Sequence, residues 1–317
     1  MKAAVVRRFD QGPQYDSFEL PAQDDRGVVV EVLAAALSPR VRSGASGAHY
    51  TSTGALPLVP GIDGVGRLAN GQRVYFLAAS DTVGTMAEQA VADSRLAVAL
   101  PDGVSASAIA AGMLPAISSW VALTQRAPIQ PGQRVLVLGA TGTAGQLAVQ
   151  IAKLLGAGEV IAAGRSAEVL EHVRGLGADQ VVRLTGTAAD GDAVARAASE
   201  VDVVLDYLWG SVTSALLPAL CRHRQAESRP LHWVLIGSVA GDEIALSSVL
   251  LRKRNLHILG SGQGASTTAE MFSVAPAIVT AFAERKLEVR LREVALADVA
   301  TAWSSRSESG ARVVFLP

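Results

Sequence analysis

Three glycines at a spacing of three residues stand in the segment GATGTAG, residues 139–145. The apolar run 135–138 comes directly before them, and a helical pattern follows. Small residues at such a turn let the backbone approach a phosphate, and the free N–H groups and positive end of the following helix attract its charge. The segment therefore predicts a dinucleotide site. The residues expected to contact the pyrophosphate are Gly139, Thr141, Gly142, Thr143, Ala144 and Gly145.

Two other phosphate-binding motifs do not match this turn. A P-loop needs Lys and then Ser or Thr after its last glycine, whereas Gln146 and Leu147 follow here. A short-chain dehydrogenase needs a tyrosine followed four residues later by lysine, and none of the four tyrosines has one. With strand before it and helix after it, the turn favours the dinucleotide-binding arrangement.

The end of the second expected strand bears on the choice of cofactor. An NAD site places Asp or Glu there, on the ribose 2′-hydroxyl. This chain has Gly164, Arg165 and Ser166 instead, and a guanidinium and a hydroxyl suit a 2′-phosphate. We therefore expect NADPH rather than NADH. Arg165 as an ordinary solvated loop residue is the alternative.

Three further strand ends carry glycines and are expected to complete the cofactor site. Ligands of open α/β sheets bind at the carboxyl ends of the strands, where LDYLWG, LIGSVAG and LGSGQG stand. The same glycines could form ordinary turns. The expected contacts are Tyr207, Leu208, Ile236, Gly237, Ser238, Gly260, Ser261 and Gly262.

The elements that must position these residues alternate along the chain. Continuous apolar strands separated by helices describe a parallel sheet covered on both faces, so the fold class is α/β with a doubly wound Rossmann sheet. A helix is expected at 143–155, and later ones begin near residues 167, 190, 211 and 247. The six expected strands are 135–138, 160–163, 180–182, 201–206, 233–237 and 257–260.

The first 118 residues have a different character, with short strands separated by Gly and Pro. Such a pattern is typical of an irregular antiparallel barrel or sandwich. The tail supplies one expected helix, 268–285, and a last strand, 311–316, that belongs to this β domain. We therefore expect one domain from 1–118 with 262–317 and a Rossmann domain from 119–261.

Composition excludes several partners. The chain has 317 residues, 50% of them hydrophobic, and a formal charge of −1, so no basic surface for nucleic acid or anionic membrane is expected. Its longest apolar segment, about 106–117, contains Pro115 and is shorter than the roughly 20 residues that span a bilayer. Cys221 is the single cysteine, which excludes an intrachain disulfide. We expect a cytoplasmic protein.

The order of motifs resembles the medium-chain dehydrogenase/reductase superfamily, and within it the zinc-independent quinone oxidoreductases. Nearly the whole chain takes part, from LSPRVRSGASGAHY and LPLVPGIDGVG through GATGTAGQLAVQIAKLLGA, VDVVLDYLWG and WVLIGSVAG to GARVVF. The resemblance implies a GroES-like catalytic domain, a Rossmann domain and a nicotinamide held between them. It also implies a homodimer formed through the edge strand His257–Gly260.

The same resemblance bears on metal and substrate. The zinc-dependent branch needs several Cys and His ligands, whereas this chain has one cysteine and has Gly61–Asp63 where that branch has Gly-His-Glu. No metal is expected. Tyr50 matches a pocket tyrosine of the family, with a packed barrel aromatic as the alternative. Ser38 stands where many relatives have Asn, and Ser118 or Ser119 matches a threonine near the nicotinamide.

The sequence thus predicts an NADPH-dependent oxidoreductase that transfers hydride to a quinone or a related conjugated carbonyl without a metal. Two alternatives stay open. One is an enoyl or acryloyl-type alkene reductase, which needs a proton donor at the α-carbon and for which Tyr50 is the candidate. The other is a non-catalytic NADPH-binding redox sensor, consistent with Ser38 in place of Asn.

Overall fold

The computed structural model describes residues 1–20, 27–80, 82–226, 228–305 and 310–317. The chain divides into two compact units, one of Met1–Leu114 with Ala275–Pro317 and the other of Pro115–Val274. The sequence predicted that the Rossmann domain begins after residue 118 and ends before residue 262. In the structure the second unit ends at Val274, later than predicted. The reason is that residues after 262 remain tied to the second unit. The side chain of Arg126 donates to the carbonyls of Gly260, at 2.9 Å, and Ala265, at 3.3 Å.

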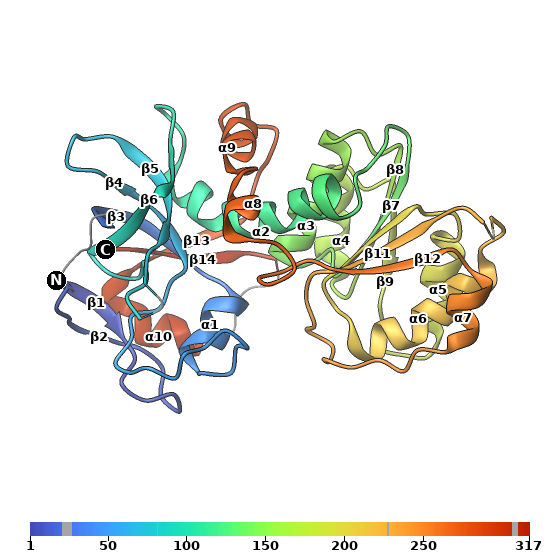
Figure 1. The fold of residues 1–317 in the computed structure, drawn as a ribbon, viewed down its shortest axis with the longest axis horizontal. Coiled ribbons are helices and arrows are strands. Elements are labelled where there is room, and N and C mark those ends of the chain that lie inside the picture. The colour runs from blue at the N-terminus through green and yellow to red at the C-terminus, as the bar shows by residue number, and fades with distance from the viewer. Residues whose placement is uncertain (21–26, 81, 227, 306–309) are drawn as a thin grey trace. The chain divides into compact units, whose positions relative to one another are not determined.

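The second unit contains a six-stranded parallel sheet in the order β12-β11-β10-β7-β8-β9 (Figure 1). The six strands expected from the apolar runs are therefore present, with ends shifted by a few residues. All of residues 135–138 in β7 are fully buried, as a central parallel strand requires. The strands are β7 Arg134–Leu138, β8 Glu159–Gly164, β9 Gln180–Arg183, β10 Val203–Asp206, β11 Leu231–Leu235 and β12 Leu256–Gly260.

Helices connect these strands by crossovers that run outward from the centre of the sheet in both directions. The helices are α3 Thr143–Leu154, α4 Ala167–Gly175, α5 Ala189–Ala197, α6 Gly210–His223 and α7 Ser248–Lys253. Because β7 and β10 are neighbours and their connections leave in opposite directions, the chain order reverses between them. A crevice for a ligand is expected at the carboxyl ends of the strands at such a point.

A long apolar helix enters the second unit. Helix α2, Ala106–Val121, continues through a π-helical turn, Ala122–Arg126, and is longer than the apolar segment seen in the sequence. By length and composition its 21 residues could cross a membrane, but 72% of its apolar 18-residue stretch is buried inside the protein. It therefore has the burial of a core helix.

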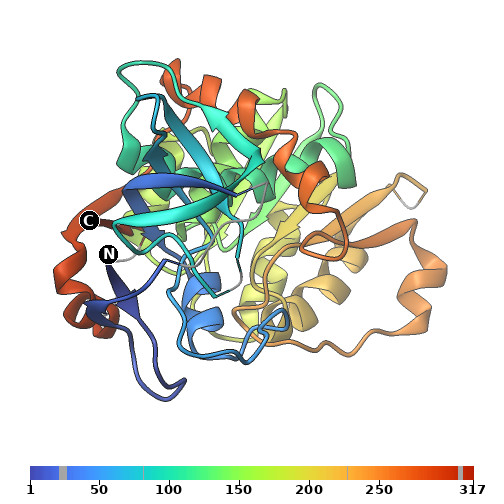
Figure 2. The ribbon, with the colours of Figure 1, turned by 60° about the vertical axis from the view of Figure 1, so that its left-hand side comes forward.

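The first unit contains a mainly antiparallel sheet in the order β13-β14-β3-β4-β5-β6, in which β3 also pairs with β6 and closes a small barrel. Both ends of the chain lie in this unit, side by side in Figures 1 and 2. The last strand, β14, pairs with β3 as expected. The strands of this sheet are β3 Gly27–Leu37, β4 Asp63–Arg67, β5 Arg73–Ala78, β6 Gln89–Ala99, β13 Leu291–Ala295 and β14 Arg312–Leu316. A separate two-stranded sheet is formed by β1 Lys2–Val5 and β2 Gln14–Ser17.

The single helix expected over 268–285 is wrong. The structure has two helices there, α8 Thr268–Phe272 and α9 Ala275–Ala283. Pro276 has no N–H to donate to the carbonyl four residues earlier, which favours a break before it, although α2 and α6 run through Pro115 and Pro218. Helix α8 lies in the second unit and α9 in the first, which also contains α1 Pro39–Ala45 and α10 Val299–Ser304.

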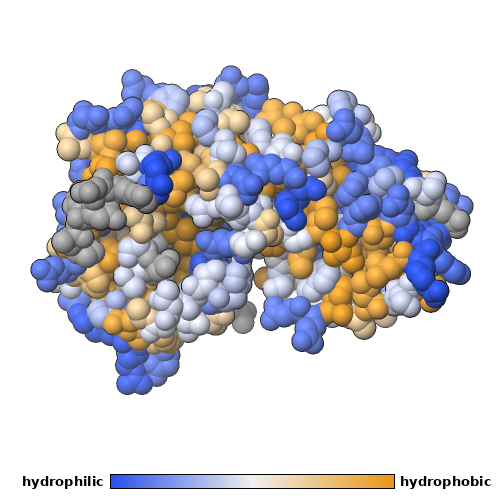
Figure 3. Space-filling model, viewed as in Figure 1, coloured by the Kyte–Doolittle hydropathy of each residue, from blue (hydrophilic) through white to orange (hydrophobic). Residues whose placement is uncertain are grey.

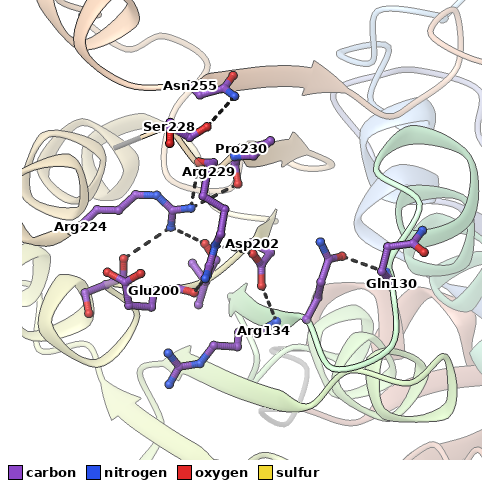
Figure 4. A network of polar contacts seen from close by, with 12 residues as sticks. Gln130, Arg134, Glu200, Asp202, Arg224, Ser228, Arg229, Pro230 and Asn255 are labelled. Atoms are coloured by element: carbon purple, nitrogen blue, oxygen red, sulfur yellow. Dashed lines mark hydrogen bonds and ion pairs between the residues drawn. The ribbon is translucent and has the colours of Figure 1, made fainter. Parts of the chain in front are cut away.

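A buried polar network fixes the amino ends of the Rossmann strands (Figure 4). Arg224 is 2% exposed, and its guanidinium donates to the carbonyls of Val201, Arg229 and Pro230 at 2.5, 3.1 and 3.2 Å. Asp202 accepts from the side chain of Arg229 at 2.9 Å. These contacts lie at the opposite end of the sheet from the carboxyl ends where a ligand is expected.

Candidate functional site

Two of the three glycines in the turn after β7 are required by the fold. Gly139 has a φ of +87°, which L side chains rarely adopt. A Cβ added at Gly145 would lie 2.3 Å from the carbonyl oxygen of Gly139, closer than real atoms come. The N–H groups of Gly139 and Ala140 both donate to the carbonyl of Ala163 at 2.9 Å, which ties the turn to β8.

Gly142 is different, because the fold does not need a glycine there. It is exposed, has a φ of −80° and a ψ of 160°, and an added Cβ would meet only the carbonyl oxygen of Gly139, at 3.5 Å. It is the N-cap residue of α3 and offers that helix no side-chain cap. The absence of a side chain leaves open space in front of the first turn.

The first turn of α3 presents backbone donors to this space. Of the residues that the structure describes, none accepts a hydrogen bond from the N–H of Thr143, Ala144 or Gly145. A twelve-residue helix with free N–H groups and no cap attracts an anion at its N-terminus. The arrangement fits the pyrophosphate of a dinucleotide.

The end of β8 carries the residues that we expect to hold a 2′-phosphate. A Cβ added at Gly164 would lie 2.5 Å from the methyl carbon of Thr141, so this glycine lets the two turns pack together. Arg165 is exposed and makes no hydrogen bond or ion pair with any described residue. The hydroxyl of Ser166 caps α4 by accepting from the N–H of Val169 at 3.3 Å. Its own proton is left to donate.

The end of β10 lies against the glycine turn. A Cβ added at Gly139 would lie 3.1 Å from a methyl carbon of Leu208 and 3.3 Å from the Cβ of Tyr207. Tyr207 is 8% exposed, and its hydroxyl is 2.8 Å from the Oγ of Ser119. Burial raises the pKa of Tyr207 to about 12, against the opposing effect of hydrogen bonds from Ser119 and Ser118. Tyr207 therefore keeps its proton at neutral pH.

The ends of β11 and β12 continue the same edge. A Cβ added at Gly237 would lie 3.1 Å from the carbonyl oxygen of Tyr207. The N–H of Ser261 donates to the carbonyl of Leu235 at 2.8 Å, so residues 260–262 lie beside the end of β11. The hydroxyl of Ser238 donates to Asp242 at 2.7 Å. The predicted cofactor residues therefore all lie along the carboxyl edge of one sheet.

The two residues predicted for the substrate pocket lie in the first unit. Ser38 is 6% exposed, and its hydroxyl accepts from the N–H of Val41 at 3.1 Å as the N-cap of α1. Tyr50 is 73% exposed, and its ring centroid is 4.2 Å from that of His49. The alternative that Tyr50 packs inside the barrel is therefore wrong, whereas its contact with a substrate stays a prediction.

Two buried carboxylates were not predicted from the sequence. Asp63 is 3% exposed, and it accepts from the hydroxyl of Tyr75 at 3.1 Å. Burial raises the pKa of Asp63 to about 6, and burial lowers the pKa of Arg312 to about 10. Asp206 ends β10 and is fully buried. The only sequence signal for either is an acidic residue beside an apolar strand.

No metal centre is evident in the part of the chain that the structure describes. No three His, Cys, Asp or Glu side chains come together there in a way that could hold a metal ion. Cys221 is 3% exposed, and burial raises the pKa of its thiol.

Comparison with known proteins agrees with this architecture. Residues 144–279 match the family model described as zinc-binding dehydrogenase. A protein named probable NADPH-dependent quinone reductase tdiC, from Emericella nidulans, is 30% identical and aligned over 91% of each chain. A chloroplastic NADPH-dependent alkenal/one oxidoreductase from Arabidopsis thaliana is 31% identical over 52% of this chain and 47% of its own.

A solved structure extends the likeness to the whole chain. The quinone oxidoreductase from Thermus thermophilus, which was also solved in complex with NADPH, is 26% identical with a TM-score of 0.82 and is covered over its full length. The glycine turn after β7, the closed barrel of the first unit and the similarity to a relative over 91% of the chain all indicate the same family. The chain belongs to the quinone oxidoreductase branch of the medium-chain dehydrogenase/reductase superfamily.

Proposed function

We propose that this protein is an NADPH-dependent oxidoreductase that transfers hydride to a quinone or a related conjugated carbonyl without a metal. The observation that carries the proposal is the open first turn of α3. Gly142 leaves space there, and the backbone donors of Thr143, Ala144 and Gly145 have no partner among the described residues. The names of the Emericella and Thermus relatives support the choice of NADPH and of a quinone.

The residues of the second unit would divide the binding of NADPH among them. The first turn of α3 would hold the pyrophosphate, and Arg165 with Ser166 would hold the 2′-phosphate by charge and by hydrogen bond. Arg165 suits this role because no described residue occupies its guanidinium. Tyr207 and Leu208 would line the same edge and limit the entry of water.

NADPH supplies the hydride, so the remaining work of the chain is positioning. The reacting carbon and the acceptor must come within roughly 3 to 3.5 Å of each other while water is excluded. A quinone suits a site without a metal because its reduced anion can take a proton from solvent. Tyr50 is exposed and could contact the acceptor, whereas the hydroxyl of Ser38 is engaged as a helix cap.

The donor chemistry of the chain supports a reaction without zinc. A catalytic zinc site is built from several Cys, His or acidic ligands, and this chain has one cysteine, which is buried. Asp63 stands where the zinc-dependent branch has the last residue of Gly-His-Glu, and its carboxylate accepts a hydrogen bond from the hydroxyl of Tyr75. The description of the matching family as zinc-binding thus does not fit the donor set of this chain.

Reduction of a C=C bond beside a carbonyl is a second candidate. The Arabidopsis relative is named for alkenals and alkenones, and the reaction needs a proton at the α-carbon. Tyr50 is the candidate donor because its phenol is 73% exposed.

We also propose a cytoplasmic homodimer that forms through β12. This strand is an edge of the Rossmann sheet, and no strand of the described residues pairs with its outer side, where the carbonyl of Gly260 accepts from Arg126. The segment before it carries exposed apolar side chains, and hydrophobic residues gather over the region of α6 (Figure 3). The exposed apolar side chains of this segment are Val239, Leu246, Val249 and Leu251.

A panel of acceptors tests the proposed function. The purified protein is given NADPH or NADH with benzoquinone, naphthoquinone, phenanthrenequinone and simple enones, and oxidation is followed by near-ultraviolet absorbance. We expect turnover on quinones with NADPH preferred. Turnover on enones alone would replace the quinone proposal with the alkene reductase. NADPH binding without turnover on any acceptor would support the redox sensor instead.

A further inference from the structure

The carboxylate of Asp206, at the end of β10, is fully buried and accepts four hydrogen bonds from neutral donors. Its Oδ1 accepts from the N–H groups of Leu208 and Trp209 at 2.8 and 2.9 Å. Its Oδ2 accepts from the hydroxyl of Thr213 at 2.5 Å and from the indole N–H of Trp233 at 2.9 Å. A carboxylate has about four acceptor positions, so all of them are used.

The turn that these bonds hold has an unfavourable backbone conformation. Trp209 has a φ of 53° and a ψ of −154°, a combination that a non-glycine residue adopts only when its surroundings enforce it. Gly210 follows with a φ of 54°, and an added Cβ would lie 2.1 Å from the carbonyl oxygen of Ala240. The hydrogen bonds that the Asp206 carboxylate accepts from the backbone therefore hold a turn that would otherwise relax.

The backbone of the same residue holds the neighbouring loop. The carbonyl of Asp206 accepts from the N–H groups of Ile236 and Gly237 at 2.8 and 3.1 Å. Ala240 closes the loop by donating its N–H to the carbonyl of Leu208 at 2.8 Å. Two segments expected to contact the cofactor, 207–208 and 236–238, are thus attached to one residue that is itself out of reach of a ligand.

We propose that Asp206 is a positioning residue for NADPH. It fixes the ends of β10 and β11 in the shape that meets the cofactor, so that little ordering remains to be done when NADPH binds. This inference rests on the NADPH binding proposed above. Its test must therefore separate a loss of positioning from a loss of fold and from a failure of NADPH to bind at all.

The variant Asp206→Asn removes one acceptor oxygen and keeps the shape. Its amide oxygen can still accept from the backbone, but its NH2 group then faces Trp233, whose indole N–H cannot accept. The hydroxyl of Thr213 can rotate to accept. We expect the Kd for NADPH to rise about tenfold or more. Adding Trp233→Phe removes the opposing donor and should restore part of the affinity.

The matched control is Asp202→Asn, at the amino end of the same strand. Asp202 is 7% exposed, and it accepts from the backbone N–H of Arg134 and from the side chain of Arg229, both at 2.9 Å. The change is chemically the same and should lower the thermal midpoint by a similar amount. Because the residue lies at the other end of the sheet, the Kd for NADPH should not change.

The Kd for NADPH is measured by calorimetric titration at a temperature at which thermal melting shows every variant folded. Unchanged binding in Asp206→Asn, or an equal loss in Asp202→Asn, would overturn the positioning role. Should Asp206→Asn not fold, Thr213→Val removes one donor and keeps the shape, and an unchanged Kd in that variant would also overturn it. Failure of the unaltered protein to bind NADPH is distinct, because it would remove the proposed function and this role together.

Discussion

The contrast between Gly142 and Gly145 gives the sharpest prediction about the turn after β7. Gly142→Val places a branched side chain where the structure has open space, since the added Cβ would meet only one atom, at 3.5 Å. A φ of −80° and a ψ of 160° suit valine. The side chain would then occupy the space in front of the first turn of α3, where we expect the pyrophosphate.

The size of the effect on binding follows from the donors that would be covered. Three N–H groups, those of Thr143, Ala144 and Gly145, are available to a charged ligand, and a hydrogen bond to a charged group contributes about 1.5–3 kcal/mol. Losing one or two of them costs about 3 kcal/mol, which is a rise in Kd of about a hundredfold. The free energy of unfolding should change by less than about 1 kcal/mol, because a lost glycine cap and a stiffer unfolded chain have opposite effects.

Gly145→Ala is the matched comparison, because it adds one methyl group to the same turn. Its Cβ would lie 2.3 Å from the carbonyl oxygen of Gly139 and 2.5 Å from the Cα of Ala140. Such overlap costs about 1–3 kcal/mol or more of stability. Calorimetric titration with NADPH and urea unfolding of both variants give the two quantities. Two results would contradict these roles of the glycines. One is a Kd for NADPH in Gly142→Val equal to that of the unaltered chain, and the other is a loss of unfolding free energy in Gly142→Val as large as in Gly145→Ala.

Three further predictions concern single side chains. Arg165→Ala should raise the Kd for NADPH much more than the Kd for NADH in titrations. An equal rise for both cofactors would show that Arg165 does not hold the 2′-phosphate. Burial raises the pKa of Asp63 from 3.8 to about 6, so the folded state binds this proton more readily than the unfolded state. About 3 kcal/mol of the free energy of unfolding is therefore lost as pH rises from about 4 to about 6. In urea unfolding, Asp63→Asn should gain stability relative to the unaltered chain between about pH 4 and pH 6, and a flat difference would contradict the raised pKa. Arg224→Lys should lower the free energy of unfolding by about 3 kcal/mol, because one ammonium cannot reach all the carbonyls that the guanidinium contacts. Arg222→Lys is the control, since the Arg222 side chain is 65% exposed and its replacement should change stability little. Equal losses of stability in the two variants would contradict the role of the buried network.

The Rossmann unit could be predicted from the sequence because its strands are central and parallel. Strands buried on both faces are continuous apolar runs, as in residues 135–138, and helices separate them at regular intervals. The prediction of one helix over 268–285 was wrong, because the sequence does not show whether a proline such as Pro276 interrupts a helix or, like Pro115 in α2, lies inside it. The later domain limit also escaped prediction, because it depends on contacts of Arg126 with residues distant in sequence.

The sequence predicted which residues form the candidate site, but not which of them the fold requires and which are left to contact a ligand. The sequence shows three glycines, yet only the structure separates Gly139 and Gly145, which the fold requires, from Gly142, which it does not. Asp206 was missed because an acidic residue at a strand end has no periodicity, and its four donors come from the following turn, from α6 and from β11. Ser38 was assigned to the pocket from resemblance. Its hydroxyl caps α1, and its contact with a substrate stays a prediction.

The central claim is hydride transfer from NADPH to a quinone without a metal, and a single-turnover experiment tests it most directly. The protein is mixed with one equivalent of NADPH and a strong metal chelator, and then rapidly with excess benzoquinone in the absence of oxygen. We expect the near-ultraviolet absorbance of NADPH to disappear much faster than in a mixture without protein, and equally fast with and without chelator. Loss of NADPH no faster than the uncatalysed reaction, or a rate abolished by the chelator, would contradict it.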